Sequence, residues 1–321
     1  MVYKESSIGI SIQANNSLNF ISSILQAEAA GIRVAWTTIG GVGGADPLTV
    51  SAAALTATKN IEIGTAIIPT WPRHPIIIAQ QALALEQLAP GRLRLGIGPS
   101  HEPMMAGNYG VNWEKPLTNL KEYLQIIRML LETGEVNFQG QTVSAIAKIK
   151  DPYPVTLMAS ALRQRSFEAC GELTDGAISW MCPKQFLIDH ALPALQIGAE
   201  RANRPIPPLV AHVPMLVTDD RKKVYTLAKQ LQRYTTIPFY RAMFEKAGYT
   251  DIDEQYPKTL IDDLVVSGSE SEVAEHLVNY INAGCGEVIA APIIDPDSPA
   301  ESFEKAVAAI ALADSKLKSK K

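Results

Sequence analysis

Short runs of β-branched and apolar residues alternate with longer amphipathic stretches along the chain. This alternation is typical of repeated strand–helix units around a parallel sheet, because each crossover between parallel strands needs a connection of a dozen or more residues. We count eight such units. The predicted strands lie at residues 8–13, 33–37, 61–68, 93–97, 155–159, 177–181, 209–217 and 287–292.

Eight strand–helix units over 321 residues match the size of one (β/α)8 barrel, the TIM barrel. Two segments fit no simple unit: a small excursion at residues 136–143, after the fourth predicted strand, and the polar, Tyr-rich residues 234–263, after the seventh. We therefore predict one α/β barrel domain over residues 1–321, with insertions after strands 4 and 7. An open, doubly wound sheet is the alternative.

The charge balance excludes one class of partner. Lysine and arginine total 29 against 33 acidic residues, so there is no basic surplus to neutralise a nucleic-acid backbone. The longest apolar runs fall well short of a membrane span, and no basic-then-apolar leader opens the chain. We therefore expect neither a nucleic-acid nor a membrane partner, but a small-molecule substrate.

The cysteine and histidine patterns predict no metal site. Only Cys170, Cys182 and Cys285 occur, without the paired spacing of a zinc site or a disulfide framework, which favours a cytoplasmic location. The five histidines are scattered without paired-ligand spacing.

The segment that ends the fourth predicted strand, Gly96-Ile97-Gly98-Pro99-Ser100-His101, only partly resembles a dinucleotide-binding fingerprint. His101 stands where that fingerprint needs a third glycine, and Pro99 would disturb its turn. In a barrel, the carboxyl end of a strand opens onto the catalytic face, so Ser100 and His101 would face a ligand. A plain strand and turn would explain the glycines but not His101.

Other segments allow two interpretations. Residues 160–165 follow a strand and begin a helix, so their N–H groups and two arginines could bind an anion, or could form an ordinary solvated first turn. Trp180 and Met181, at a strand end, are either core residues or a cofactor wall. The glycine-rich loop at residues 40–44 lacks the lysine of a P-loop, and its contact with a ligand stays open.

Several blocks together resemble the bacterial luciferase-like superfamily over nearly the whole chain. They are Ala35-Trp36-Thr37-Thr38, the run from Ile63 to Thr70, Arg73-His74-Pro75, the run from Ala89 to Gly98, and Asp175-Gly176. Within that superfamily, the Gly-Pro-Ser-His ending at residues 98–101 is most similar to the branch that uses coenzyme F420, an 8-hydroxy-5-deazaflavin.

The resemblance implies a barrel that holds a flavin-like cofactor at the carboxyl ends of its strands, usually in a homodimer. It implies a cis peptide between Ala66 and Ile67 behind the central cofactor ring, and a cofactor phosphate near the backbone of Ser160, Ala161 and Leu162. The cofactor-binding residues that it implies are Thr37, Thr38, Ala66, Ile67, Ser100, Ser160, Ala161, Leu162, Trp180 and Met181.

The resemblance also makes His101 the candidate catalytic residue, because it occupies the place of an acidic catalytic residue in a related sugar-phosphate dehydrogenase branch. A histidine with an ordinary pKa of about 6.5 can exchange a proton at cellular pH. Two departures matter. Gly40 stands where that branch has a second catalytic histidine, and Pro99 stands where the luciferase branch has a phosphate-binding arginine.

The leading hypothesis is therefore an oxidoreductase that transfers a hydride between coenzyme F420 and a C=C, C=O or C=N bond of a small organic substrate, with His101 exchanging the proton. One alternative is an FMN-dependent monooxygenase supplied by a separate reductase. The other is a non-catalytic flavin-binding protein on the same scaffold, because a fold does not fix an activity.

Overall fold

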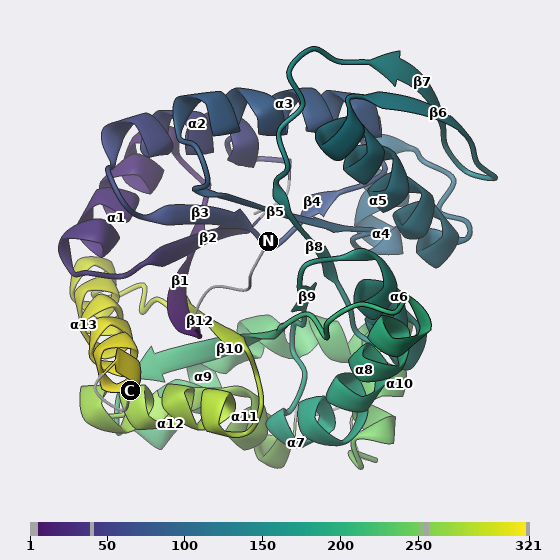
Figure 1. Cartoon of the computed structure of the whole chain (residues 1–321). Coiled ribbons are helices and arrows are strands. Elements are labelled where there is room, and N and C mark those ends of the chain that lie inside the picture. Colours follow the sequence, from purple (N-terminus) through teal and green to yellow (C-terminus); the bar gives the residue numbers. More distant parts are fainter. Residues whose placement is uncertain (1–5, 39–41, 251, 253–256, 319–321) are drawn as a thin grey trace.

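The computed structural model describes residues 6–38, 42–250, 252 and 257–318. Figure 1 shows a ring of helices around a central set of strands, viewed from the side on which the strands begin. Within the described residues, eight parallel strands close into a barrel in the order β1, β2, β3, β5, β8, β9, β10 and β12, with β12 returning to β1. The predicted TIM barrel is confirmed.

The strand positions agree closely with the predicted ones. The barrel strands are β1 (Ser7–Gln13), β2 (Val34–Thr38), β3 (Glu62–Thr65), β5 (Leu93–Gly98), β8 (Thr156–Ser160), β9 (Ala177–Ile178), β10 (Leu209–Val217) and β12 (Glu287–Pro292). Two short strands extend the sheet: β4 (Ile68–Pro69) pairs with β5, and β11 (Val266–Gly268) pairs with β10.

The third predicted strand is divided in two. The peptide bond between Ala66 and Ile67 is cis, as the family resemblance implied, and the backbone leaves the ladder there. The strand at 61–68 therefore becomes β3 and β4, on either side of this bond. The sixth strand, predicted to reach residue 181, ends at Ile178 in β9.

Eight helices within the described part of the chain cover the outside of the barrel. They are α1 (Ser17–Ala29), α2 (Pro47–Ala57), α3 (Pro75–Leu88), α5 (Pro116–Thr133), α6 (Gln164–Leu173), α8 (Leu192–Arg201), α12 (Glu270–Asn282) and α13 (Pro299–Lys318). The start of α2 shows the local cause: Asp46 accepts a hydrogen bond from the Thr49 N–H at 2.9 Å, and Pro47 occupies the first turn. No helix in these described ranges is both long and apolar enough to cross a membrane.

The remaining elements are additions to the barrel. Between β5 and β8 lie α4 (Glu102–Tyr109) and a hairpin of β6 (Glu135–Gln139) and β7 (Ser144–Lys148). The hairpin replaces the small excursion expected at 136–143. A short helix, α7 (Lys184–Phe186), and a π-helical turn (Leu187–Ala191) precede α8. After β10 come α9 (Arg221–Ala228), the 3-10 helix η2 (Lys229–Thr236), α10 (Pro238–Lys246) and α11 (Lys258–Leu264).

The inside of the barrel has its own apolar cluster, separate from the larger core between strands and helices. Its members are Val34, Trp36, Met158, Ile178, Val210 and Ile289, with Ala66 and Ile67 packed against them. The Trp36 ring needs glycine on the neighbouring strands: a Cβ on Gly64 would overlap the ring, and one on Gly9 would lie 3.1 Å from it. One large side chain therefore fills space left by two strands.

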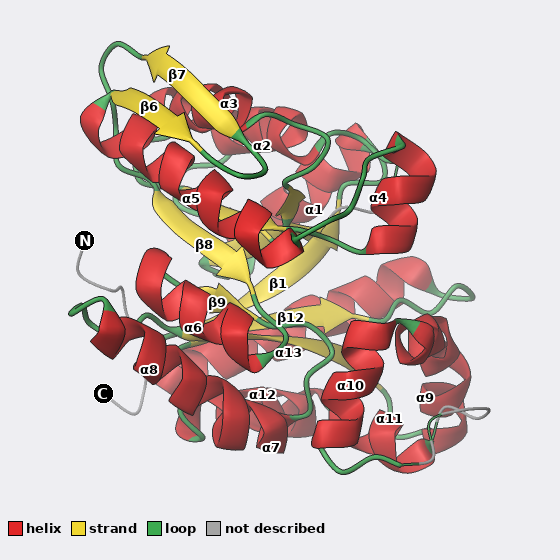
Figure 2. Ribbon diagram, turned by 90° about the vertical axis from the view of Figure 1, so that its right-hand side faces the viewer, coloured by secondary structure: helices red, strands yellow, loops and turns green. Residues whose placement is uncertain are grey.

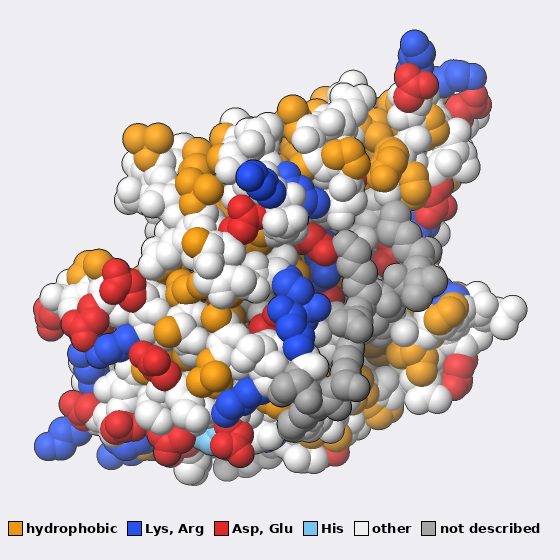
Figure 3. All heavy atoms as spheres, turned by 60° about the vertical axis from the view of Figure 1, so that its left-hand side comes forward, with side chains coloured by type: hydrophobic (Ala, Val, Ile, Leu, Met, Phe, Trp, Pro, Cys, Tyr) orange, Lys and Arg blue, Asp and Glu red, His pale blue; other side chains and the backbone are white. Residues whose placement is uncertain are grey.

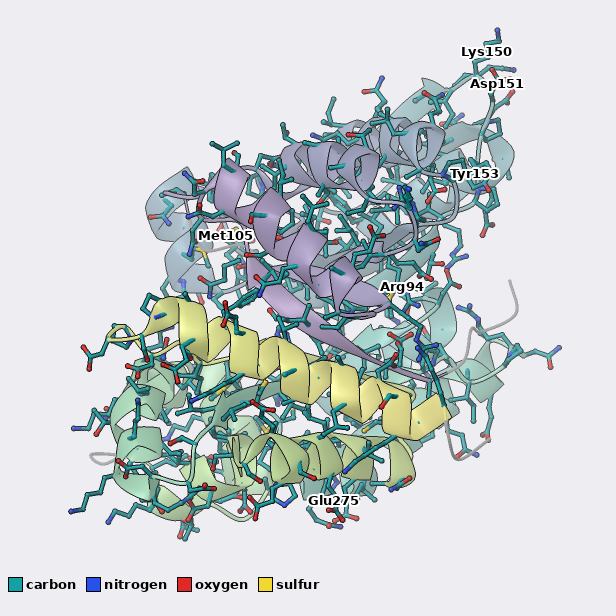
Figure 4. The ribbon with its side chains drawn as sticks, turned by 90° about the vertical axis from the view of Figure 1, so that its left-hand side faces the viewer. Arg94, Met105, Lys150, Asp151, Tyr153 and Glu275 are labelled. Atoms are coloured by element: carbon teal, nitrogen blue, oxygen red, sulfur yellow. The ribbon has the colours of Figure 1, made fainter. Side chains whose placement is uncertain are left out.

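A buried cluster of ion pairs lies at the amino end of the barrel. Arg94 on β5 bonds Glu62 on β3, with 2.6 Å between Nε and Oε2, and also bonds Glu287 on β12. All three side chains are largely buried. The two carboxylates raise the pKa of Arg94 despite its burial. Figure 4 shows Arg94 and Met105 toward opposite sides of the molecule, Arg94 near the side on which the strands begin.

The surface carries both signs of charge. Figure 3 shows Lys and Arg side chains beside Asp and Glu side chains over much of one face. Some surface ion pairs are local, such as Lys305 with Glu301 one helical turn away, and others join distant segments, such as Lys121 with Glu172.

Removing the guanidinium of Arg94 is predicted to destabilise the fold. Arg94→Met would leave the Glu62 and Glu287 carboxylates buried without it, at a cost of about 3 to 5 kcal/mol in the free energy of unfolding. Adding Glu62→Gln and Glu287→Gln should recover much of that loss. Urea unfolding followed by circular dichroism measures both variants.

Lys305→Met is the matched control, because it breaks an exposed ion pair worth less than about 1 kcal/mol. A loss for Arg94→Met no larger than that of the control would contradict this account of the amino end.

Candidate active site

The two additions to the barrel meet over the carboxyl ends of the strands. Figure 2 shows α4 and α10 on the same side of the molecule, the side toward which the strand arrows point. Trp113, just after α4, lies against Phe239 on α10 with ring centroids 5.6 Å apart. The Trp113 indole N–H donates to the Pro99 carbonyl at 3.2 Å, which ties this contact to the end of β5.

His101 lies at the centre of this region. It follows β5 directly and is the residue before the first turn of α4. Its half-buried ring faces two tyrosines edge-on, with centroids 5.9 Å from Tyr234 and 5.5 Å from Tyr240. Residues far apart in the sequence therefore form one aromatic wall.

The protonation state of His101 differs from the expectation. Burial, and then the positive charge of Arg233, lower the pKa of His101 from 6.5 to about 4. The expected ordinary pKa was therefore wrong, because the sequence did not show that Arg233 and the tyrosines would cover the ring. At neutral pH the imidazole is therefore uncharged, and one of its ring nitrogens keeps a lone pair.

The aromatic wall continues into the barrel through Trp180. The ring of Trp180 lies 5.8 Å from Tyr234 and 4.4 Å from His212, measured between centroids. His212 is 6% exposed, and burial lowers its pKa to about 3. In the sequence, His212 is only one of five scattered histidines. Its position could have identified it: His212 lies two residues after Val210 on the same strand, so its polar side chain faces the same side as Val210, the inside of the barrel.

Two of the residues implied by the resemblance, Ile67 and Ser160, meet at Gly98. A Cβ on Gly98 would overlap the Ser160 hydroxyl and come within 2.9 Å of the Ile67 side chain. The cis peptide that joins Ala66 to Ile67 therefore lies beside the ends of β5 and β8. Glycine at this point lets the Ser160 and Ile67 side chains pack directly against the backbone of β5.

Two of the implied residues have unusual backbones. Ser100 and Met181 have left-handed conformations, with φ of 60° and 56°. Non-glycine residues adopt this conformation rarely, and they concentrate at functional sites. Ser100 is half-buried, whereas Met181 is fully buried in the core between the strands and the helices.

The expected phosphate site has most of its N–H groups already bonded. The Ala161 N–H donates to Ile178, and the Leu162 and Arg163 N–H groups donate to the Ser166 hydroxyl. The first N–H groups of α6, at Gln164 and Arg165, have no partner within the helix, as at any helix start. An anion here would be bound by those groups or by arginine side chains.

Thr37 and Thr38 end β2. Thr37 is 1% exposed and lies on the opposite side of the strand from Trp36, whereas Thr38 is half-buried. Residues 39–41, which include Gly40, lie outside the described residues, and so do parts of the expected insertion at 234–263.

Nine buried side-chain nitrogen and oxygen atoms have no hydrogen-bond partner among the described residues. Four of them lie toward the carboxyl end of the barrel: Thr70 Oγ1, Trp71 Nε1, Trp180 Nε1 and His212 Nε2. The others are Ser7 Oγ, Trp36 Nε1, Thr37 Oγ1, Gln81 Oε1 and Asn119 Oδ1. Each such atom costs free energy, so the four at the carboxyl end fit a ligand that has polar edges. No group of three or more potential metal ligands occurs in the part of the chain that the structure describes.

Comparisons of sequence agree with the geometry. A family model described as luciferase-like monooxygenase matches residues 11–287. The 5,10-methylenetetrahydromethanopterin reductase of Archaeoglobus fulgidus is 24% identical over 266 residues, which cover 75% of this chain and 79% of that protein. An uncharacterised protein of Mycobacterium tuberculosis is 26% identical over 225 residues, and the match spans 64% of this chain and 66% of that protein, just under two thirds.

Solved structures share the fold. An F420-dependent secondary alcohol dehydrogenase in complex with an F420–acetone adduct matches with a TM-score of 0.79 at 17% identity, covering 96% of this chain and 99% of that one. EDTA monooxygenase from Chelativorans sp. BNC1 matches with a TM-score of 0.75 at 14% identity, covering 99% and 94%. At these identities the likeness shows the barrel fold alone.

His101 is predicted to stay neutral well below pH 6. Its ring resonances in NMR spectra, assigned by their loss in His101→Asn, should hardly move between pH 8 and about 5, because its pKa is about 4. Arg233→Met removes the nearby positive charge and should make these resonances begin to move at a higher pH.

Arg241→Met, which removes a charge paired with Glu245 one turn further along α10, serves as the control and should leave the His101 resonances unchanged. A wild-type midpoint near 6.5, or identical curves for the wild type and Arg233→Met, would refute this account of His101.

Proposed function

The chain belongs to the luciferase-like monooxygenase family, and we propose on that premise that it is an oxidoreductase that transfers a hydride between coenzyme F420 and a small organic substrate. The observation that carries the proposal is the uncharged His101 at the end of β5, inside an aromatic wall at the mouth of the barrel. A neutral imidazole at this place can accept a proton from a substrate hydroxyl.

The residues present fit such a cofactor. The Ala66–Ile67 peptide and Gly98 would lie beside its ring, and Trp180 would close one side. The first turn of α6, with Arg163 and Arg165, would hold its phosphate. When bound, the deazaflavin accepts or supplies a hydride at C5, while the protein orients the partners and moves the proton.

His101 can carry the proton of an alcohol–carbonyl interconversion. In substrate oxidation, the hydroxyl oxygen would give its proton to a ring nitrogen of His101, and the carbon that bears this oxygen would lose a hydride to the bound deazaflavin, so that C–OH becomes C=O. In reduction, the same proton would return from His101 to the oxygen. We propose an alcohol as the reduced substrate, because its hydroxyl supplies a proton to the uncharged imidazole. Tyr234 and Tyr240 would exclude water from the transfer.

The same fold also occurs in a monooxygenase solved in complex with FMN, the oxygenating constituent of 3,6-diketocamphane monooxygenase of Pseudomonas putida. The proposal of F420 rests on the relatives that use this coenzyme by name, such as the F420-dependent glucose-6-phosphate dehydrogenase of Amycolatopsis mediterranei. Cofactor identity is therefore the first property to measure.

The test is a fluorescence titration of the purified protein with F420 and, separately, with FMN. We expect tighter binding of F420, followed by anaerobic reduction of bound F420 with a panel of alcohols. His101→Asn should lower kcat by about 10² to 10⁴ with little change in F420 affinity, because it removes proton transfer and leaves the ring pocket intact.

His276→Asn, on the exposed side of α12, is the matched control and should keep wild-type kcat. Preferential binding of FMN would instead support the monooxygenase. Binding of F420 without turnover of any alcohol, or full activity of His101→Asn, would refute the proposed mechanism.

We further propose that the protein is a homodimer that buries the outer sides of α2 and α3. These two helices contain a single charged residue, Glu86, which is 3% exposed, although Ile77 and Leu88 on α3 are 47% and 51% exposed. An uncharged outer surface is unusual for a helix facing water and suits a two-fold contact between copies.

Light scattering should therefore give about twice the chain mass of 34.8 kDa. Ala84→Arg places a charge on the exposed side of α3 and should shift the protein toward monomer, whereas Ile197→Arg on α8 should not. A monomeric wild type, or a dimer that Ala84→Arg leaves intact, would exclude this interface.

A further inference from the structure

His212 and Trp180 lie at one level inside the barrel. Val210 and Ile178 belong to the apolar cluster of the barrel interior, on β10 and at the end of β9. His212 and Trp180 each follow two residues later, so their side chains point inward on the same side, nearer the carboxyl ends of the strands. Their ring centroids are 4.4 Å apart.

Both side chains carry a nitrogen without a partner. Among the described residues, neither His212 Nε2 nor Trp180 Nε1 makes a hydrogen bond, and both atoms are removed from solvent. The His212 residue is only 6% exposed. A phenylalanine at either place would stack equally well and leave no polar atom unpaired. Stacking alone therefore does not account for these two residue types.

The contrast with the amino end of the same barrel supports this point. There, the buried Arg94 guanidinium bonds two carboxylates from two different strands. The barrel thus pairs its buried charges where no ligand enters. At the end where the aromatic wall and the left-handed Ser100 lie, it leaves the nitrogens of His212 and Trp180 unpaired. The Trp36 indole nitrogen, within the apolar cluster of the interior, is unpaired as well.

We propose that His212 and Trp180 bind the polar edge of a planar heterocycle of the pyrimidinedione type, the ring edge that flavins and deazaflavins share. This inference rests on the proposed function in that it requires a ring cofactor in this barrel. It assigns the recognition of that ring to two named side chains, one of which lies outside the motifs of the family resemblance.

The hydrogen-bonding groups are complementary. A pyrimidinedione edge presents a carbonyl, an N–H and a second carbonyl, so its partner must offer a donor, an acceptor and a donor. A neutral imidazole has one N–H and one nitrogen lone pair, and an indole has one N–H. Burial keeps His212 neutral, because it lowers the pKa to about 3. The two unpartnered nitrogens can therefore meet neighbouring groups of that edge. The Trp180 indole N–H donates to a carbonyl, and His212 Nε2 accepts from the edge N–H in the tautomer that carries its proton on Nδ1.

The experiment uses the deazaflavin chromophore with and without its edge N–H: 8-hydroxy-5-deazariboflavin and its N3-methyl derivative, titrated by fluorescence against the full chain. We expect the wild type to bind the N3–H compound at least about tenfold more tightly. His212→Phe should weaken the N3–H compound about tenfold and leave the N3-methyl compound unchanged, because one hydrogen-bonded pair is lost.

Two further variants keep the test sharp. His212→Gln retains a donor and an acceptor and should restore part of the preference for N3–H. Trp180→Phe removes only the indole donor and should weaken both F420 and FMN. The melting temperature of ligand-free His212→Phe should equal or exceed that of the wild type, because an unpaired buried nitrogen is removed.

Equal weakening of both compounds by His212→Phe, together with a lower melting temperature, would overturn the inference, since it would show a packing role alone. An unchanged preference for N3–H would overturn it as well. If FMN rather than F420 binds and His212→Phe weakens FMN about tenfold, the ring-binding role is supported and the proposed F420 function fails.

Discussion

Arg94 holds together parts of the barrel that do not touch through their backbones. It extends from β5 to Glu62 on β3 and to Glu287 on β12, and two other strands, β1 and β2, separate β3 from β12 in the ring. A buried guanidinium and buried carboxylates destabilise the fold unless they form ion pairs with each other. The amino end is therefore fixed in one arrangement, and the apolar interior and the site are built above it.

The amino end of the barrel contributes to stability, and the carboxyl end contains the candidate active site. The amino end pairs its buried charges within the chain. The carboxyl end carries the cis peptide, two left-handed residues and nitrogen atoms without partners. A rigid lower half lets the upper half keep features that cost free energy by themselves. The neutral state of His101 depends on the rigid strands as well, because they fix the positions of α4 and η2, which cover its ring.

The features of the fold that depend on short stretches of sequence could be predicted. The eight strands and the Asp46 cap followed from periodicity and helix signals, and the cis bond at Ala66 followed from the family resemblance. The contacts of His101 with Tyr240 could not be predicted, because 139 positions separate them and no periodicity encodes the meeting of two loops. The lowered pKa of His101 was missed for the same reason. The hairpin β6–β7 was underestimated because its strands are short and half-exposed.

The packing of Trp36 against Gly9 and Gly64 has a consequence for how this barrel evolves. The indole occupies volume that belongs to three adjacent strands, so no one of the three positions can change alone. A larger residue at 9 or 64 collides with the ring, and a smaller residue at 36 leaves a hole that neither glycine fills. Residues 9, 36 and 64 must therefore change together. Relatives that have lost the tryptophan should have regained side chains on both flanking strands in the same lineage.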